Sequence, residues 1–287
     1  MAELGPSPST LAFYAAHGPV TDPGPHHALL AGLPADLETL CALMQGLLVH
    51  VHWAERLGLA LSEARRAEVN LRAVARQLER LRALDDSPLA MCRPPERRLV
   101  GNCRDFSVLL CAILRHQHVP ARARCGFATY FRPGHFEDHW VCEVWDRKRE
   151  RWRRVDAQLE DFQRQVLAID FDPLDVPASQ FLIAGEAWQQ CRAGEADPDA
   201  FGIFDMHGLW FVQGNVVRDL LSLNKLELLP WDAWGHMAPP GKPPSAEELA
   251  FMDDIAALTI SVDEHFDEVR AIFAEDPGLR PPLDWAA

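Results

Sequence analysis

The feature that most constrains this chain is an apolar helical segment followed directly by segments that alternate as strands do. Residues 102–115 repeat apolar side chains at helical spacing, and Pro120 prevents the helix from continuing. Residues 121–131 then show the pattern of a half-buried strand, and residues 138–146 and 151–156 form two further strands. This order predicts an α+β fold in which the helix packs against a small antiparallel sheet.

The rest of the chain is expected to be mostly helical. Apolar residues recur at helical spacing, and good capping residues such as Ser62 and Ser245 precede two of the segments. The expected helices cover residues 34–51, 62–84, 179–193, 210–224, 246–258 and 261–274. Residues 1–33 are rich in Pro, Gly and His and are interpreted as an irregular arm, and residues 239–244 as a linker.

Composition excludes several classes of protein. The formal charge of −14, from 42 acidic and 28 basic residues, disfavours nucleic-acid binding, which needs a surplus of Lys and Arg. Seven scattered cysteines without a CxxC motif do not suggest a secreted disulfide framework. The first ten residues lack the features of a signal peptide, and the uncharged segment 39–54 is too short to span a bilayer. We therefore expect a cytoplasmic protein without a membrane partner.

Cys103 is the strongest candidate for a reactive residue. It lies where a loop enters the apolar helix, and a helix N-terminus stabilises a thiolate. The preceding Gly101 would let the backbone approach a substrate closely. His139 is predicted on one strand and Asp156 at the end of the next, so an antiparallel pair would bring them together. The three residues would then act as nucleophile, base and orienting group.

The sequence around these residues resembles the transglutaminase-like superfamily over roughly residues 97–160. The similar stretches are GNCRDFSVLLCAILRHQHVPARARCGF, HFEDHWVCEVWD and RWRRVDAQ. The positions that match the family pattern are Gly101, Cys103, Arg115, Pro120, Ala121, Arg122, His139, Trp140, Trp152 and Asp156. The chain as a whole also looks like bacterial transglutaminase-like proteins of similar length. Two departures are His118, where the family usually has Gly in a left-handed turn, and Ala157, where it often has Pro.

The resemblance implies a papain-like core with catalytic residues Cys103, His139 and Asp156. The expected substrate is a peptide, amide or thioester, whose acyl group passes through a thioester on Cys103 to water or to an amine. No cofactor and no metal are expected, and the oligomeric state is left open. The implied division of the chain is an N-terminal arm with helices (1–94), a catalytic core (95–175) and a helical region packed on the core (176–287).

Other interpretations remain open at this stage. One is a non-catalytic papain-like scaffold or binding protein that keeps a vestigial site. A metalloprotein is disfavoured, because the histidines of His50-x-His52 would point apart on a helix and no nearby side chains complete a ligand set. The Trp-rich segment 206–234 is interpreted either as a substrate-pocket wall that helps to close the cleft or as a structural helix; the structural reading is favoured.

Overall fold

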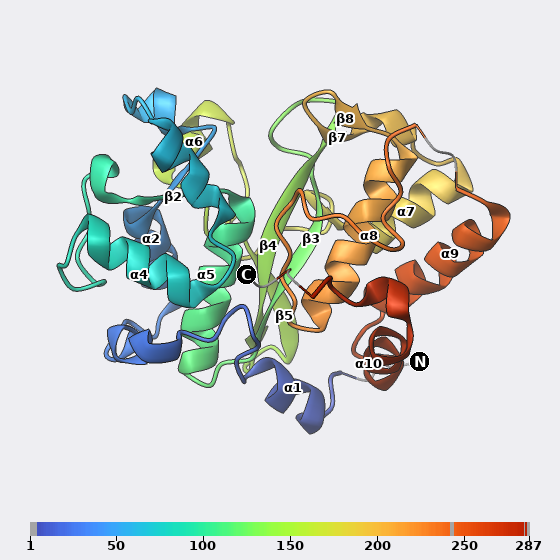
Figure 1. The fold of residues 1–287 in the computed structure, drawn as a ribbon, viewed down its shortest axis with the longest axis horizontal. Helices are drawn as coiled ribbons and strands as arrows, with labels where there is room; N and C mark the ends of the chain where they lie inside the picture. Colours follow the sequence, from blue (N-terminus) through green and yellow to red (C-terminus); the bar gives the residue numbers. More distant parts are fainter. Residues whose placement is uncertain (1–4, 242–243, 284, 286–287) are drawn as a thin grey trace. The chain divides into compact units, whose positions relative to one another are not determined.

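The computed structural model describes residues 5–241, 244–283 and 285 (Figure 1). Helices account for 46% of the residues and strands for 14%, so the fold mixes helix and sheet. The α-helices are α1 (Pro8–Tyr14), α2 (Leu37–Leu47), α3 (Glu63–Arg66), α4 (Val74–Leu84), α5 (Cys103–His116), α6 (Asp161–Val166), α7 (Ala184–Ala193), α8 (Leu209–Leu223), α9 (Ala246–Ile260) and α10 (Phe266–Glu275). The strands are β1 (Leu48–His50), β2 (Leu99–Gly101), β3 (Ala121–Ala128), β4 (Phe136–Asp146), β5 (Arg151–Val155), β6 (Phe181–Ile183), β7 (Phe201–Ile203) and β8 (Met206–His207).

The chain divides into two compact units that interleave along the sequence. The first unit takes its described residues from the segments 1–11, 124–140 and 177–287, and the second from the segments 12–123 and 141–176. Strands β3 and β4 therefore contribute residues to both units. The three-part division expected from the sequence stays a prediction. Of the linker expected separately at residues 239–244, Lys242 and Pro243 lie outside the described residues.

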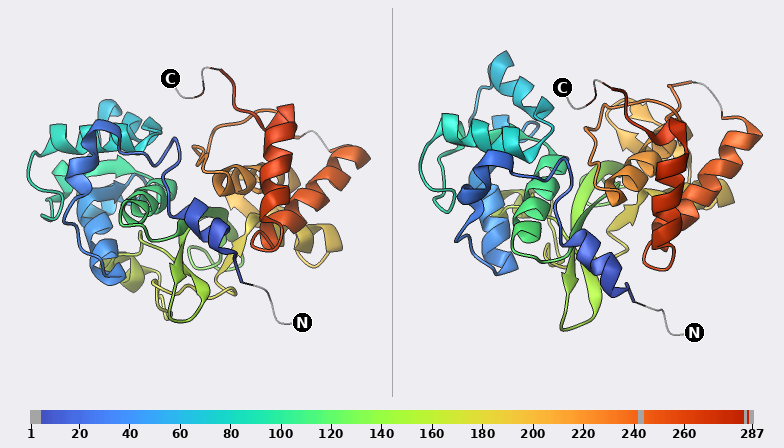
Figure 2. Two further views of the ribbon diagram at one scale, coloured as in Figure 1. Left: turned by 90° about the horizontal axis from the view of Figure 1, so that it is seen from below. Right: turned by 60° about the horizontal axis from the view of Figure 1, so that its bottom comes forward.

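The first unit combines an open sheet with a group of helices. Its strands follow the order β6-β3-β4-β7-β8, in which β6 is antiparallel to β3 and β7 runs parallel to β4. Helices α7, α8 and α9 pack against one another, and α10 packs against α8 and α9; Figure 2 shows α8, α9 and α10 in orange to red. Phe136 stacks on Phe201 with ring centroids 4.3 Å apart, which joins β4 and β7 in an aromatic core.

The second unit is built around α5, which is buried from Cys103 through Arg115. Helices α2 and α4 and strand β2 pack against it. Strands β1 and β2 form a short parallel pair in which Leu48 faces Leu99. The C-terminal half of β4 is antiparallel to β5, with Cys142 opposite Val155, so these two strands form the expected hairpin.

Several predicted helices differ from the structure at their ends or in their middle. The helix expected over residues 179–193 begins only at Ala184, because residues 181–183 form β6, and the helix expected over residues 261–274 begins only at Phe266. The helix expected over residues 34–51 ends at Leu47, because the next three residues pair with β2. The helix expected over residues 62–84 is broken between α3 and α4. At this break Glu68 is buried, accepts a hydrogen bond from the Val100 N–H at 2.9 Å and forms an ion pair with Arg80 at 2.7 Å.

Two further expectations are corrected by burial and by local structure. The N-terminal arm is not irregular throughout, since it contains α1, whose last residue Tyr14 is fully buried. The strand at 121–131 is not half-buried, because all eight residues of β3 are buried. Its arginines are paired instead of exposed: Arg122 lies 2.7 Å from Glu143 in the second unit. Charged residues in an alternating pattern therefore mark internal ion pairs here.

The described helices also bear on the membrane question. None of them combines the length and the apolar run that a membrane crossing requires.

Candidate active site

A capping box fixes the backbone at the start of α5, where Cys103 lies. Cys103 is the first residue of the helix and is 8% exposed. The Asn102 side chain accepts a hydrogen bond from the Arg104 N–H at 3.0 Å, and the Asp105 carboxylate accepts one from the Asn102 N–H at 2.9 Å. These reciprocal bonds fix the first turn and therefore the position of the Cys103 backbone.

The carboxylate of Asp105 anchors this turn in the interior of the second unit. Gln77 Nε2 and Arg104 Nη1 each donate to its Oδ1 at 2.9 Å. Burial raises the pKa of the Asp105 carboxyl, while the charge of Arg104 and the hydrogen bonds from Asn102, Arg104 and Gln77 act to lower it. Arg104 is itself fully buried and paired with Asp105. Its positive charge is thus balanced locally, beside the helix start.

The structure gives Gly101 a packing role beside the capping box. A Cβ atom at this position would lie 3.0 Å from the Cβ and from Oδ2 of Asp105, and 3.2 Å from Cδ2 of Leu48. All three distances are shorter than ordinary van der Waals contacts. The missing side chain leaves room for the capping carboxylate, and the close approach of a substrate to Gly101 stays a prediction.

Asp156 directly follows β5 in the second unit and is 2% exposed. Its backbone N–H donates to the Pro173 carbonyl at 2.8 Å, and its Oδ1 accepts from the Gln158 N–H at 3.0 Å. Gln45 on α2 donates to the neighbouring Ala157 carbonyl at 3.2 Å. Because α2 also packs against α5, one helix contacts both the Asp156 loop and the helix that begins at Cys103.

His139 lies on β4, in the part of the strand that belongs to the first unit. Its ring is 1% exposed and stands edge-on to three aromatic rings. The ring centroids are 4.9 Å away for Phe131, 5.9 Å for Tyr130 and 6.4 Å for Phe181. These contacts restrict the imidazole to few orientations. Cys103 and Asp156 belong to the second unit, so the convergence of all three side chains stays a prediction.

The other cysteines differ from Cys103 in their surroundings. Cys92 is exposed. Burial raises the pKa of the Cys41 thiol to about 12 and that of Cys191 to about 11. Cys111 and Cys142 are fully buried with their sulfur atoms 3.2 Å apart, and burial, reinforced by Cys111, raises the pKa of Cys142 well above its usual value. The environments of Cys41, Cys111, Cys142 and Cys191 therefore make their thiols poorly suited to react.

The histidine positions test two details of the sequence analysis. His118 has a φ of 58°, which confirms the left-handed turn expected after the helix. His50 and His52 are not on a helix, because His50 ends β1 and His52 lies in the turn after it. Their ring centroids are 5.5 Å apart, so the rings do not point apart as expected. In the part of the chain that the structure describes, no three His, Cys, Asp or Glu side chains are grouped to hold a metal ion.

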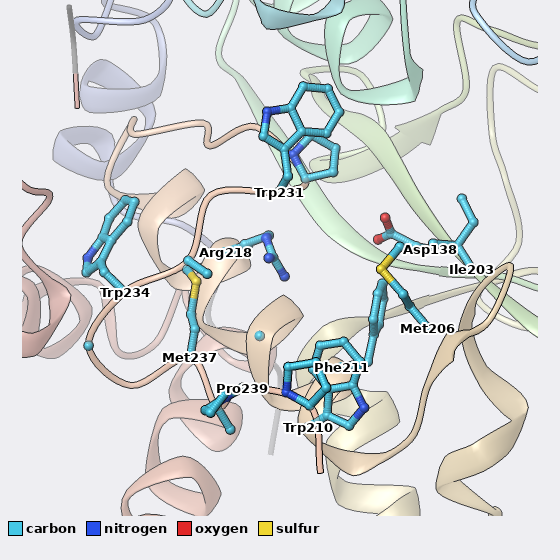
Figure 3. Close-up of a pocket in the computed structure, with 16 residues that line it drawn as sticks. Asp138, Ile203, Met206, Trp210, Phe211, Arg218, Trp231, Trp234, Met237 and Pro239 are labelled. Carbon is cyan, nitrogen blue, oxygen red and sulfur yellow. The ribbon is translucent and has the colours of Figure 1, made fainter. Parts of the chain in front are cut away.

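The Trp-rich segment forms most of a cavity within the first unit (Figure 3). Helix α8 is buried along most of its length, as the structural interpretation requires. Trp210, Trp231 and Trp234, however, line the cavity together with Asp138 of β4. Sequence analysis missed Asp138, although an acidic residue one position before His139 and on the same face as Trp140 was a signal. Whether the segment closes the cleft of the catalytic site stays a prediction.

Comparison with known protein families finds a family that is similar to the central part of the chain. The family model of the transglutaminase-like superfamily matches residues 61–157. This segment is transglutaminase-like. The match contains Cys103, His139 and Asp156, and it extends the resemblance found in the sequence to include α3 and α4. Members of the transglutaminase-like superfamily are generally cysteine-dependent acyltransferases or peptidases. Comparisons of the chain with curated proteins and with solved structures give no match.

Proposed function

We propose that this protein is a cysteine-dependent acyltransferase or amidase with a papain-like arrangement of Cys103, His139 and Asp156. The observation that carries the proposal is the position of Cys103 as the first residue of α5, within the transglutaminase-like segment. The partial positive charge and free N–H groups of a helix N-terminus favour the thiolate, which is the reactive form of cysteine.

The proposed reaction has two steps. The Cys103 thiolate attacks the carbonyl carbon of an amide or thioester and forms a C–S bond. His139 as imidazolium gives its proton to the leaving amine or thiol as the original C–N or C–S bond breaks. Water or an amine then attacks the thioester, His139 takes its proton, and the Cys103 thiolate is released. The partial positive charge at the N-terminus of α5 stabilises the oxyanion in both steps.

His139 and Asp156 have the burial that these roles need. The aromatic rings around His139 hold the imidazole in place and limit access of water. Asp156 is buried at the end of β5, which is the antiparallel neighbour of the strand that carries His139. In the proposal the Asp156 carboxylate accepts a hydrogen bond from the imidazole, selects its tautomer and stabilises the imidazolium.

A pH series of alkylation rates tests the thiol activation. The experiment uses a Cys92→Ser variant, in which the exposed thiol is absent. Peptide mass spectrometry identifies which cysteine has been alkylated. Cys103 is expected to react rapidly at about pH 6, well below the ordinary thiol pKa of about 8.5. His139→Gln is expected to move this profile to higher pH, while His27→Gln, at an exposed histidine, leaves it unchanged.

The outcome separates the enzyme from the scaffold interpretation. A single ordinary titration near about 8.5 in both wild type and His139→Gln means that the imidazole does not activate the sulfur, and the vestigial scaffold becomes the better account. An activated thiol is then tested with peptide amides and thioesters, with and without a fluorescent primary amine. Release of free acid identifies a hydrolase, and incorporation of the amine identifies an acyltransferase. Cys103→Ala abolishes either activity.

A further inference from the structure

The first unit contains a cavity of about 530 Å³, a size typical of small-molecule sites. It lies between α8, the adjoining ends of β7 and β8 at Ile203 and Met206, and the loop that follows α8, and Figure 3 shows aromatic rings on several sides of it. Most of its wall is apolar. The largest apolar side chains that line it are Met206, Trp210, Phe211, Trp231, Trp234 and Met237. Met206 and Trp231 are 43% and 51% exposed, so the apolar wall is open to solvent at its rim.

One acidic side chain reaches this cavity from the sheet. Asp138 is 8% exposed, and burial raises the pKa of its carboxyl, with the charge of Arg218 as the largest opposing effect. Its Oδ1 accepts a hydrogen bond from Asn215 Nδ2 at 2.8 Å. Among the described residues no other side chain donates to this carboxylate, so it retains acceptor capacity toward the cavity.

One basic side chain reaches it from α8. Arg218 is 8% exposed, and its guanidinium points into the cavity (Figure 3). Nη1 donates to Asn215 Oδ1 at 3.1 Å and Nη2 donates to the Asp232 carbonyl at 3.0 Å. A guanidinium has five N–H donors, so these two acceptors, both neutral, leave part of its capacity unused within the described chain. Such a group is suited to a planar anionic ligand such as a carboxylate.

The two charged groups and the aromatic wall together select a class of ligand. A ligand with only an ammonium group would leave Arg218 without an anionic partner, and one with only a carboxylate would leave Asp138 without a cationic one. A zwitterion satisfies both. We propose that this cavity binds a zwitterionic α-amino acid with an aromatic side chain, its carboxylate on Arg218, its ammonium on Asp138 and its ring among the tryptophans.

This cavity is separate from the surroundings of His139. Successive side chains of a strand point to opposite faces, so Asp138 and His139 face opposite sides of β4. Asp138 accordingly bonds to Asn215 of α8, whereas His139 contacts Tyr130, Phe131 and Phe181. The proposed binding does not rest on the thiol chemistry, and each is tested without the other.

Gly214 offers a variant that blocks the cavity without disturbing the helix. A Cβ at this position would lie 2.8 Å from Arg218 Nη1, the far end of a flexible side chain. In Gly214→Ala the guanidinium is displaced and the added methyl group occupies part of its place. A helix interior favours Ala over Gly, so α8 is expected to remain intact. Asp138→Asn provides a second variant that removes the negative charge and keeps the shape of the side chain.

The test is titration of the full-length protein with L-phenylalanine, followed by tryptophan fluorescence and by calorimetry. Saturable binding is expected, and 2-phenylethylamine and 3-phenylpropionate, which lack one charge each, are expected to bind at least about tenfold more weakly. Gly214→Ala is expected to abolish binding, and Asp138→Asn to weaken L-phenylalanine binding at least about tenfold with little effect on 3-phenylpropionate. Phe204→Ala, at a 65% exposed residue outside the cavity wall, is the matched control and binds as wild type does.

Several results would overturn the proposal. They are the absence of saturable L-phenylalanine binding by the folded wild type, equal binding by either cavity variant, and an analogue that binds as tightly as the amino acid. Loss of binding in Phe204→Ala would assign the signal to the exposed apolar turn instead. Far-UV circular dichroism and thermal unfolding establish whether each variant is folded. If Gly214→Ala does not fold, the binding measured with Asp138→Asn tests the proposal.

Discussion

Arg124 and Asp219 form a two-point ion pair in the interior of the first unit. Arg124 Nε lies 3.0 Å from Oδ1 of Asp219, and Nη2 lies 2.7 Å from Oδ2. The side chains are 2% and 0% exposed. The same carboxylate accepts from the Cys125 N–H at 2.9 Å, and Arg124 also donates to the Thr259 carbonyl at 2.9 Å. One buried carboxylate thus ties β3 to α8, and its partner arginine reaches α9.

Asp219→Ala is expected to destabilise the protein by about 3–5 kcal/mol, because it leaves the charge of Arg124 buried without a partner. Urea unfolding followed by circular dichroism measures the loss. Arg124→Leu combined with Asp219→Ala is expected to recover part of it, since no unpaired charge remains. The control is Asp86→Ala, which removes an exposed ion pair with Arg82 and costs less than about 1 kcal/mol. Equal losses of stability in Asp219→Ala and Asp86→Ala would contradict the conclusion that the buried ion pair is the more important of the two.

Gly101→Ala is expected to disturb the start of α5. The added Cβ would press on Asp105 and Leu48, and forcing extra volume into a packed site typically costs about 1–3 kcal/mol. Because Asp105 closes the capping box, the alkylation rate of Cys103 is expected to fall as well. Gly5→Ala, where no atom lies within 4 Å of the new Cβ, serves as the control. Wild-type stability and Cys103 reactivity in Gly101→Ala would contradict this prediction, because they would mean that the added Cβ is accommodated without moving the capping carboxylate of Asp105.

The stability of the protein is expected to decrease as the pH falls below about 6.5, the ordinary histidine value. Burial, followed by the charge of Arg115, lowers the pKa of His17. The folded protein therefore keeps the His17 ring neutral at pH values where this residue of the unfolded chain has already bound a proton. Acid then favours the unfolded state until the folded pKa is passed. Thermal unfolding at several pH values measures the effect.

His17→Gln is expected to reduce this acid sensitivity, and His27→Gln, at an exposed ring, is expected to leave it unchanged. If the two variants lose stability with pH in the same way as wild type, His17 does not contribute to the transition.

Thiol counting in the native protein is expected to detect Cys92 and Cys103 first. Cys41, Cys142 and Cys191 have raised pKa values because of burial, and Cys111 is fully buried beside Cys142. A thiol-reactive disulfide reagent at neutral pH, with peptide mapping of the modified sites, measures the order of reaction. All seven cysteines are expected to react after unfolding. Rapid native modification of Cys111 or Cys142 would reveal an opening of the interior around α5.

Local sequence signals predicted the elements that carry the candidate site. The segment 102–115 is α5 within one residue at each end, because its apolar spacing and Pro120 are both local features. The hairpin of β4 and β5 and the capping box at Ser245 followed in the same way, since a turn or a cap is decided by residues close together in the chain. The family pattern then named Cys103, His139 and Asp156 as candidates.

What only the tertiary structure decided depends on partners far apart in the sequence. The three-residue strand β1 forms because β2 lies beside it, and without that neighbour its residues continue a helical pattern. The arginines of β3 are internal because Glu143 and Asp219 meet them, which no alternation of polar residues reveals. Asp138 and Arg218 face one cavity because β4 and α8 are packed together. Periodicity reports which residues share a face, whereas burial and charge pairing are set by whatever covers that face.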